Sequence, residues 1–551
     1  MTQYLIGRIK TLKLPEIISN LGKNWFIPFS ALCFFLSNTG LQVEFYYSAF
    51  TAFVLILLLS AVCPPFGSFF SETSLKHRII ALFSSLGICL CTWDILKYKP
   101  LFSLENAFLI RSVLVILALP FVFAVNLLFW KKIEGVIGTI IGKAEIKKAE
   151  WIVYLILFLI YGIFVAFSFM RTNAFYDTDL KLDVIYTSDS SALVENNAFI
   201  LIDNVENDVR QPLFAVLSAP LLGIPGLIGS VLHKIIPSIP SVLIIDYGQI
   251  ILLLAAALIL AVELKLNWIQ RICFVLVFSS TYTFLLFSLM MEQYVVAFFW
   301  LVMTIHFMIN DSKEAWIFSY ASTGTLLTSG VLVPFFLLRG EKGMEAVIKF
   351  VERLVIYGIE FVVLMLISGR LNLIMNFWNN VGVLSLFTGR SVGYGARVLQ
   401  YFSFIAGVFY APGSLEVHYD GYYGDYNTWQ LAEVSSLNIA GLIIFALALA
   451  GFIISRKEKI SQIALGWIGF SLILLILVGW GTAENGLVLY SLYFGWPFLV
   501  LIFRLIKALE DKCKVKWIIP ALSFAVIVFL LFHNIPATAE MLSFAVREFP
   551  V

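Results

Sequence analysis

The sequence predicts an all-α polytopic membrane protein with about 14 transmembrane helices. Of the 551 residues, 60% are hydrophobic and 13% are charged, well below the roughly 25% charged residues of soluble domains. Apolar runs of about 17 to 25 residues recur along the chain, and in lipid such a run can satisfy its backbone only as a helix. These runs lack the alternating faces of a transmembrane β-barrel.

The charge and cysteine content exclude several classes of protein. The net charge of +2 gives no reason to expect a nucleic-acid partner. Basic residues fall in short clusters beside apolar runs, where they set the orientation of the helices. The six cysteines lie in or beside apolar runs, without the spacing of a disulfide framework or a metal site. No phosphate-binding glycine loop, Cys-x-x-Cys pair or zinc motif is present, which disfavours an ATP-driven pump or a redox enzyme.

The first part of the chain predicts a four-helix transmembrane module over residues 1–130. The module contains four apolar runs, at 24–40, 46–66, 79–96 and 107–130. Basic residues precede the first run and no small-residue cleavage site follows it, so we expect an uncleaved signal anchor with a cytoplasmic N-terminus. Five lysines then mark 131–150 as a cytoplasmic linker.

The segment 151–170 is expected to cross outward and to begin an exterior loop over 171–240. Between Arg171 and Leu213 this loop holds eight acidic residues against three basic ones, and the dearth of positive charge agrees with an exterior position. The stretch 212–236 is apolar but contains several prolines, which break or kink helices. We favour a pair of short helices at the outer interface, and a kinked transmembrane helix is the alternative.

The remaining sequence predicts a transmembrane core over 151–535 and an exterior tail over 536–551. The path of residues 371–411 is not defined by the pattern, and a tyrosine-rich second exterior loop is expected over 389–436. Basic clusters after Lys148 all fall on the cytoplasmic side in this scheme. The expected helical segments are 241–262, 272–290, 294–309, a hairpin of two short helices over 315–338, 347–368, 437–454, 461–480, 486–503 and 517–534.

Three acidic residues and one arginine stand out in the first loop. Asp189 is flanked by hydroxyl residues, which can hold a carboxylate in one rotamer, as a general base requires. Arg210 closes the loop with a planar fork of donors suited to a phosphate. Asp177 and Asp179 have the spacing of paired carboxylates that hold a divalent metal, Mg or Mn, with a diphosphate. The alternative for the whole loop is a solvated acidic surface.

Two glutamates and two tyrosines are further candidates for substrate binding. Glu292 lies in the apolar run SLMMEQYVVAFF, where a carboxylate is costly unless it faces a cavity or a partner. A helix-end carboxylate at the water boundary is the alternative. Glu484 follows an expected outer helix end and is read in the same way. Tyr394 and Tyr422 belong to the second exterior loop, where aromatic faces can stack on sugars or form an interface belt.

Together these features resemble the GT-C superfamily, integral-membrane glycosyltransferases that use polyprenyl-phosphate sugars. The likeness covers about residues 151–535. It rests on the acidic first loop with Asp189, the closing element Arg210-Gln211-Pro212-Leu213-Phe214, the short helices after it, and a glutamate between two later helices. Bacterial members often carry His-Pro-Leu where this chain has Gln211-Pro212-Leu213, so a role for that histidine does not carry over.

The resemblance implies sugar transfer at the outer face of a bacterial plasma membrane, from a polyprenyl-phosphate donor to a cell-envelope glycan or a lipid-linked acceptor. Asp189 matches the first-loop aspartate and would act as the base of an inverting reaction. Cations stabilise a departing phosphate, and the exterior candidates are Arg210, Arg390, Arg397 and His418. Topology or headgroup contact is the alternative for Arg390 and Arg397, and a loop histidine without catalytic duty is the alternative for His418.

Two other functions stay open. A flippase or transporter of lipid-linked oligosaccharide would carry polar residues near the midplane of several helices. In this sequence the carboxylates crowd the outer loops, which favours chemistry at the surface. A polymerase or ligase of envelope polysaccharide shares the same loop-based design.

Overall fold

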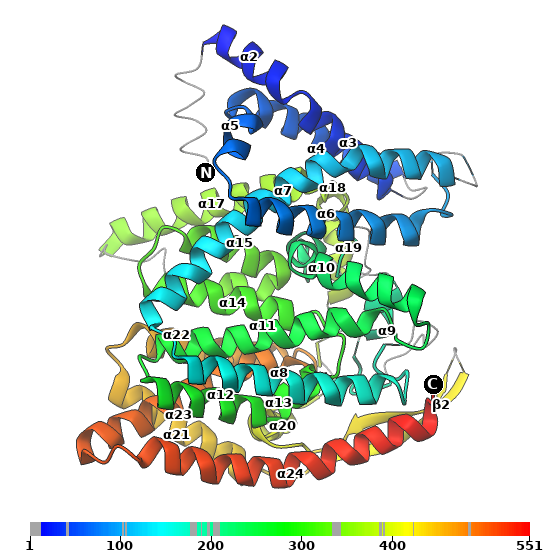
Figure 1. The fold of residues 1–551 in the computed structure, drawn as a ribbon. Coiled ribbons are helices and arrows are strands. Elements are labelled where there is room, and N and C mark those ends of the chain that lie inside the picture. The colour runs from blue at the N-terminus through cyan, green and yellow to red at the C-terminus, as the bar shows by residue number, and fades with distance from the viewer. Residues whose placement is uncertain are drawn as a thin grey trace. The chain divides into compact units, whose positions relative to one another are not determined.

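The computed structural model describes residues 13–39, 43–101, 104, 107–176, 184–188, 190–195, 199–201, 210–332, 343–384, 388–389, 392–421, 424–482 and 486–551. Within these ranges the chain is helical apart from one β-hairpin and short connections (Figure 1). Nine of the described helices are long and apolar enough to cross a membrane, and four shorter helices are also apolar. The protein is therefore an all-α polytopic membrane protein in its coarse class.

The chain divides into two compact units. The first unit comprises residues 1–139, 196–237 and 337–380, and the second comprises 140–195, 238–336 and 381–551. The first unit thus contains the predicted four-helix module together with two segments from later in the sequence. The residues that carry most of the expected chemistry, apart from Arg210, belong to the second unit.

The first unit is built from helices of unequal length. They are α2 (Leu14–Asn24), α3 (Phe26–Ser37), α4 (Val43–Val62), α5 (Phe66–Ser71), α6 (Leu75–Leu96), α7 (Phe108–Ala144), α10 (Phe214–Ile235), α17 (Gly343–Ile367), α18 (Leu371–Met375) and α19 (Phe377–Leu384). The last residues of α7, 140–144, and of α19, 381–384, already belong to the second unit. Much of the predicted cytoplasmic linker over 131–150 is helical, because α7 continues to Ala144. Ile133, Val136 and Ile140 are buried at helical spacing, and this apolar stripe extends the helix beyond the lipid-length run.

Helix α10 corrects the expected pair of short helices. It is one helix of 22 residues despite Pro220 and Pro225 in its interior, and it lies alongside α6 (Figure 1). A Cβ on Gly87 would meet the Gly223 carbonyl oxygen at 1.9 Å, so the two backbones are in direct contact. The Ser84 hydroxyl also donates to the Pro220 carbonyl over 3.1 Å. Close packing through small residues and hydroxyl donors lets a membrane helix tolerate proline.

The second unit contains the remaining elements. They are α8 (Lys148–Phe169), α9 (Ser190–Glu195), α11 (Val242–Glu263), α12 (Trp268–Ser280), α13 (Tyr282–Phe287), α14 (Tyr294–Ile309), α15 (Ala315–Thr325), the 3₁₀ helix η1 (Leu327–Leu332), α20 (Tyr394–Phe409), β1 (Ser414–Gly421), β2 (Gly424–Leu431), α21 (Ile439–Ser455), α22 (Lys459–Leu472), the π-helix η3 (Ile473–Val478), the 3₁₀ helix η4 (Gly486–Tyr490), α23 (Ser491–Cys513) and α24 (Ile518–Glu548).

Two expected loops are structured in this unit. The second exterior loop, 389–436, contains α20 and the hairpin, because the apolar face of α20 is covered and the hairpin pairs along its whole length. The exterior tail, 536–551, is helical to Glu548, since α24 continues through Pro536. The end of α24 lies beside β2 (Figure 1).

The hairpin holds the first acidic loop through backbone hydrogen bonds. β1 and β2 are antiparallel, with Ser414 opposite Leu431 and His418 opposite Asn427. On the other edge of β2, Ile185 forms a parallel bridge with Trp429. The Trp429 amide donates to the Val184 carbonyl and the Tyr186 amide to the Trp429 carbonyl, each over 2.8 Å. Residues 184–186 therefore act as a short third strand.

A buried ion pair joins the first turn of α8 to the first turn of α12. The Arg271 guanidinium donates to both carboxylate oxygens of Glu150, over 2.7 Å in each case. Tyr247, near the start of α11, donates to the Gly162 carbonyl in the last part of α8. Helices α8 and α11 therefore run in opposite directions, so Phe169 at the end of α8 and Val242 at the start of α11 lie at the same end of this unit.

Candidate functional site

Tyr186 anchors the acidic loop to three other segments. Its side chain is 1% exposed, and its hydroxyl lies 2.8 Å from the Tyr282 hydroxyl and 2.7 Å from Ser414 Oγ. Trp429 Nε1 donates to the same hydroxyl over 3.2 Å. Burial raises the pKa of Tyr186 above its ordinary value, so the residue remains a neutral phenol near pH 7. Sequence reasoning missed this residue, because an isolated tyrosine in a polar loop carries no spacing signal.

The backbone at the same point is strained. Tyr186 and Thr187 have φ angles of 51° and 57°. These values lie in the left-handed region of the backbone, which residues other than glycine, asparagine and aspartate rarely adopt. Each such residue costs roughly 1–3 kcal/mol and persists only where the surroundings enforce it. The amide of Ser188 closes the turn by donating to the Ile185 carbonyl over 3.1 Å. We call residues 184–188 the loop anchor.

Asp189 follows the loop anchor directly and lies outside the described residues. Its neighbours Ser188 and Ser190 are 4% and 3% exposed, whereas a fully solvated loop would expose small polar side chains at this point. Five other predicted site residues also lie outside the described residues: Asp177, Asp179, Arg390, Tyr422 and Glu484. The roles predicted for these six residues stay predictions.

A second group of polar side chains is buried where α13 ends and α14 begins. Glu292 lies in this break and is fully buried, and Gln293 is 3% exposed. Asp246 and Gln249, on the first turns of α11, are also fully buried. Gln249 Nε2 lies 3.3 Å from Asp246 Oδ1 and 3.4 Å from Met291 Sδ, which links α11 to the break. We call these four residues the polar cluster.

The polar cluster shows how far Glu292 is buried, and its predicted role in substrate binding stays a prediction. A carboxylate at the water boundary would be partly exposed, and Glu292 is not. Asp246 was missed, although its position in the apolar run VLIIDYGQIILL gave the same signal that singled out Glu292. Buried carboxylates inside a membrane protein are costly, so both residues are candidates for a functional site.

Stacked tyrosines border the polar cluster. The Tyr294 ring is 5.6 Å from that of Tyr493, with an interplanar angle of 29°, and 5.9 Å from that of Tyr490. Gly481 has a φ of 69°, and a Cβ there would meet the Tyr490 ring at 2.3 Å. The Gly481 turn therefore packs against Tyr490 of η4, and Tyr490 in turn packs against Tyr294.

Arg397 is engaged by backbone carbonyl groups. Its Nε donates to Val392, its Nη1 to Ile476 and Leu477, and its Nη2 to Gly389, over 2.5–3.1 Å. The side chain is 6% exposed, and these bonds close the end of η3. This geometry favours a structural role over contact with a phosphate. Tyr394, one turn earlier, is 65% exposed, and its ring lies 5.0 Å from the Arg397 guanidinium carbon.

The two remaining candidates lie in different units. Arg210 is half-buried and belongs to the first unit. His418 is exposed on β1 of the second unit, with Nδ1 3.1 Å from Asn427 Oδ1. Asn427 in turn donates to Glu548 at the end of α24 over 3.0 Å. His418 is thus accessible to a ligand at the end of the unit that carries the loop anchor.

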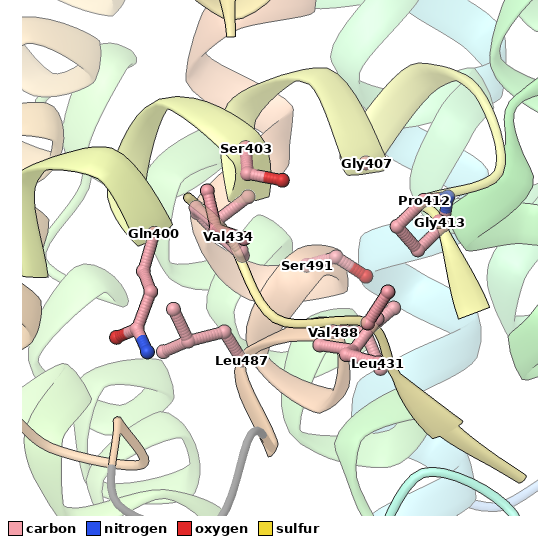
Figure 2. Close-up of a pocket in the computed structure, with 12 residues that line it drawn as sticks. Gln400, Ser403, Gly407, Pro412, Gly413, Leu431, Val434, Leu487, Val488 and Ser491 are labelled. Atoms are coloured by element: carbon pink, nitrogen blue, oxygen red, sulfur yellow. The ribbon is translucent and has the colours of Figure 1, made fainter. Parts of the chain in front are cut away.

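A small pocket lies between α20, the base of the hairpin and η4 (Figure 2). Its volume is about 40 Å³, enough for a few water molecules rather than a sugar ring. Gln400 extends toward Leu487, and Ser491 lies on the side of Pro412 (Figure 2). Two lining residues, Pro412 and Gly413, directly precede Ser414, whose hydroxyl is hydrogen-bonded to Tyr186. The pocket therefore lies next to a residue that contacts the loop anchor.

No protein-family model, curated protein or solved structure matches this chain. The described residues contain no group of three or more histidine, cysteine or acidic side chains that could hold a metal ion. Asp177 and Asp179 lie outside them, and the proposed magnesium or manganese at these two residues stays a prediction.

Proposed function

We propose that the protein is an inverting glycosyltransferase that moves a sugar from a polyprenyl-phosphate donor to a cell-envelope glycan or lipid-linked acceptor. The reaction takes place at the outer face of a bacterial plasma membrane, at the end of the second unit that carries the loop anchor. The proposal joins the resemblance of the sequence to the GT-C superfamily with the local structure of the acidic loop.

The observation that carries the proposal is the loop anchor. Two consecutive left-handed residues, a buried tyrosine and two backbone hydrogen bonds to Trp429 fix the chain immediately before Asp189. An acidic loop that only faces water has no need for such strain. A general base, in contrast, must be held at a defined distance from the proton that it takes.

In the proposed reaction Asp189 accepts the proton of an acceptor hydroxyl group. The hydroxyl oxygen forms a bond to the anomeric carbon of the sugar, and the bond from that carbon to the phosphate oxygen breaks. The polyprenyl phosphate leaves with the bonding electron pair, and a nearby cation would stabilise its charge. Attack opposite the leaving group inverts the anomeric configuration.

The polar cluster is proposed to bind the polar part of the substrate. Asp246 is a fully buried acceptor, and sugar hydroxyl groups are donors that can satisfy it. Asp246 Oδ2 and Gln249 Oε1 have no hydrogen-bond partner within the part of the chain that the structure describes. A buried acceptor without a partner is destabilising until a ligand or water supplies a donor.

The test is sugar transfer by protein in nanodiscs, offered a panel of radiolabelled polyprenyl-phosphate sugars and envelope acceptors. We expect product from the wild type and from Asp203→Asn, a matched change in the same acidic segment, and none from Asp189→Asn. Full activity in a properly inserted Asp189→Asn variant would show that Asp189 is not the base. If no variant gave product and the wild type moved fluorescent lipid-linked sugar between leaflets, the protein would be a flippase instead.

A further inference from the structure

An apolar groove opens between α21 and α24 in the second unit. Its floor is formed by α23 and α12, and its volume is about 290 Å³. No polar atom contributes to its surface. Its walls include Ile443 on α21 and Leu522, Phe529 and Leu530 on α24.

The groove faces outward rather than into the protein core. Ile443 on one wall is 53% exposed, and Phe529 and Leu522 on the other are 50% and 43% exposed. Both α23 and α24 are long and apolar enough to cross a membrane, so hydrocarbon chains surround the groove at this depth. A space of this size with only apolar walls fits a hydrocarbon chain and not a polar ligand.

The position of the groove along α24 fits one lipid leaflet. Residues Leu522 to Leu530 lie about 6–18 Å from the start of the helix at Ile518, at about 1.5 Å per residue. One half of the hydrocarbon core is about 15 Å thick. An acyl chain whose headgroup lies at the start of α24 would therefore pass along the groove toward the middle of the membrane.

The start of α24 carries positive charge. Lys512 and Lys516 are exposed on either side of the turn between α23 and α24, and within the described ranges neither forms an ion pair. Trp517, beside them, is 71% exposed, as is common at the interface between membrane and water. Lysines in this position attract anionic headgroups.

We propose that the groove between α21 and α24 binds one acyl chain of an anionic phospholipid whose headgroup lies at Lys512 and Lys516. This lipid site is separate from the proposed transfer site, which lies at the other end of α24 beside the hairpin. The inference rests on the apolar walls, the depth of the groove and the two lysines, and it holds whether or not the protein transfers sugar.

The test measures lipid retained by the purified full-length protein with native mass spectrometry, after exchange into detergent with phosphatidylglycerol or phosphatidylcholine. We expect one phosphatidylglycerol per chain in preference to phosphatidylcholine. Ile443→Trp fills the groove and should lower retention at least 10-fold. Ile453→Trp, on the same helix and 64% exposed but outside the groove, should retain lipid as the wild type does.

A second pair of variants tests the headgroup. Lys512→Gln with Lys516→Gln should weaken the preference for phosphatidylglycerol about 5-fold for each lysine, and the matched arginine variant should keep it. Lys514 is left unchanged because its φ is 57°. Equal retention of both phospholipids by the wild type, or unchanged retention in Ile443→Trp, would overturn the proposal. Displacement of phosphatidylglycerol by equimolar polyprenyl phosphate would also overturn the proposal, because the groove would then bind a polyprenyl chain.

Discussion

Replacing Tyr186 by phenylalanine removes a single hydroxyl group from the loop anchor. Ser414 Oγ keeps a contact to the Pro412 carbonyl at 3.1 Å, and the Tyr282 hydroxyl keeps one to Met541 Sδ at 3.8 Å. Trp429 Nε1, by contrast, loses the acceptor it has in this structure. One buried donor left unsatisfied costs about 2 kcal/mol, which corresponds to about 4–8 °C in Tm for a large domain.

The effect on transfer should exceed the effect on stability. Without the hydroxyl, fewer hydrogen bonds stabilise the strained backbone at Tyr186 and Thr187. Asp189 follows this backbone directly, so its position should shift. A shift of about 1 Å in a catalytic group can lower a rate about 100-fold. We therefore expect Tyr186→Phe to reduce the transfer rate roughly 10–100-fold at a temperature where the protein remains folded.

The assay compares initial transfer rates and thermal unfolding of Tyr186→Phe and Tyr401→Phe. Tyr401 is also fully buried and its hydroxyl has one side-chain partner, Ser471 Oγ at 2.8 Å. The control should lose some stability and keep its transfer rate. If both variants lost stability and transferred sugar at the wild-type rate, the loop anchor would not position the base.

Three further predictions concern stability. Gly441→Ala should lower the free energy of unfolding by about 1–3 kcal/mol, because the new Cβ would meet the Phe402 carbonyl oxygen at 1.9 Å. Gly469→Ala is the control, since Gly469 has open space around it. An equal Tm for both variants would refute the close contact of α20 and α21. Glu150→Gln leaves the buried Arg271 charge uncompensated and should lower the free energy of unfolding by about 3–5 kcal/mol, as measured by thermal unfolding. A change below about 1 kcal/mol would contradict the ion pair. Since burial raises the pKa of Tyr186 above an unfolded value of about 10, the unfolded chain ionises first on the alkaline side, and stability should be lost as the pH rises above about 10. Tyr186→Phe should make that alkaline loss smaller, and an unchanged pH dependence would contradict the burial of this phenol.

The helical class followed from the sequence because lipid leaves the backbone few choices. An apolar run of sufficient length must satisfy its own hydrogen bonds, so α8, α11 and α24 begin within a few residues of the predicted segments. Element ends were harder to predict, since they depend on neighbours. The extension of α24 through Pro536 depends on contacts of its last turns with residues such as Thr172, whose hydroxyl donates to the Phe549 carbonyl.

Packing between distant segments explains the other differences. Proline content predicted a break in 212–236, but contact of Gly223 with Gly87 is invisible in a local pattern. The hairpin was missed because its strands are polar and lie among tyrosines. Its second strand also pairs with residues 184–186, which are distant in the sequence.

The sequence marks a candidate site residue where chemistry alone makes the residue unusual. Glu292 stood out as a carboxylate in an apolar run, and its complete burial agrees with that reasoning. Tyr186 did not stand out in the sequence, because its hydrogen-bond partners Tyr282, Ser414 and Trp429 are distant from it along the chain. Arg397 shows the reverse case, since a charge that suggests a phosphate ligand is engaged by backbone carbonyls.

The central claim is tested most directly by sugar transfer in nanodiscs with the wild type, Asp189→Asn and Asp203→Asn side by side. The account predicts product of inverted anomeric configuration from the wild type and from Asp203→Asn, and none from a folded, inserted Asp189→Asn. Wild-type product from Asp189→Asn would contradict the assignment of the base, and no transfer from any polyprenyl-phosphate sugar in the panel would contradict the proposed function.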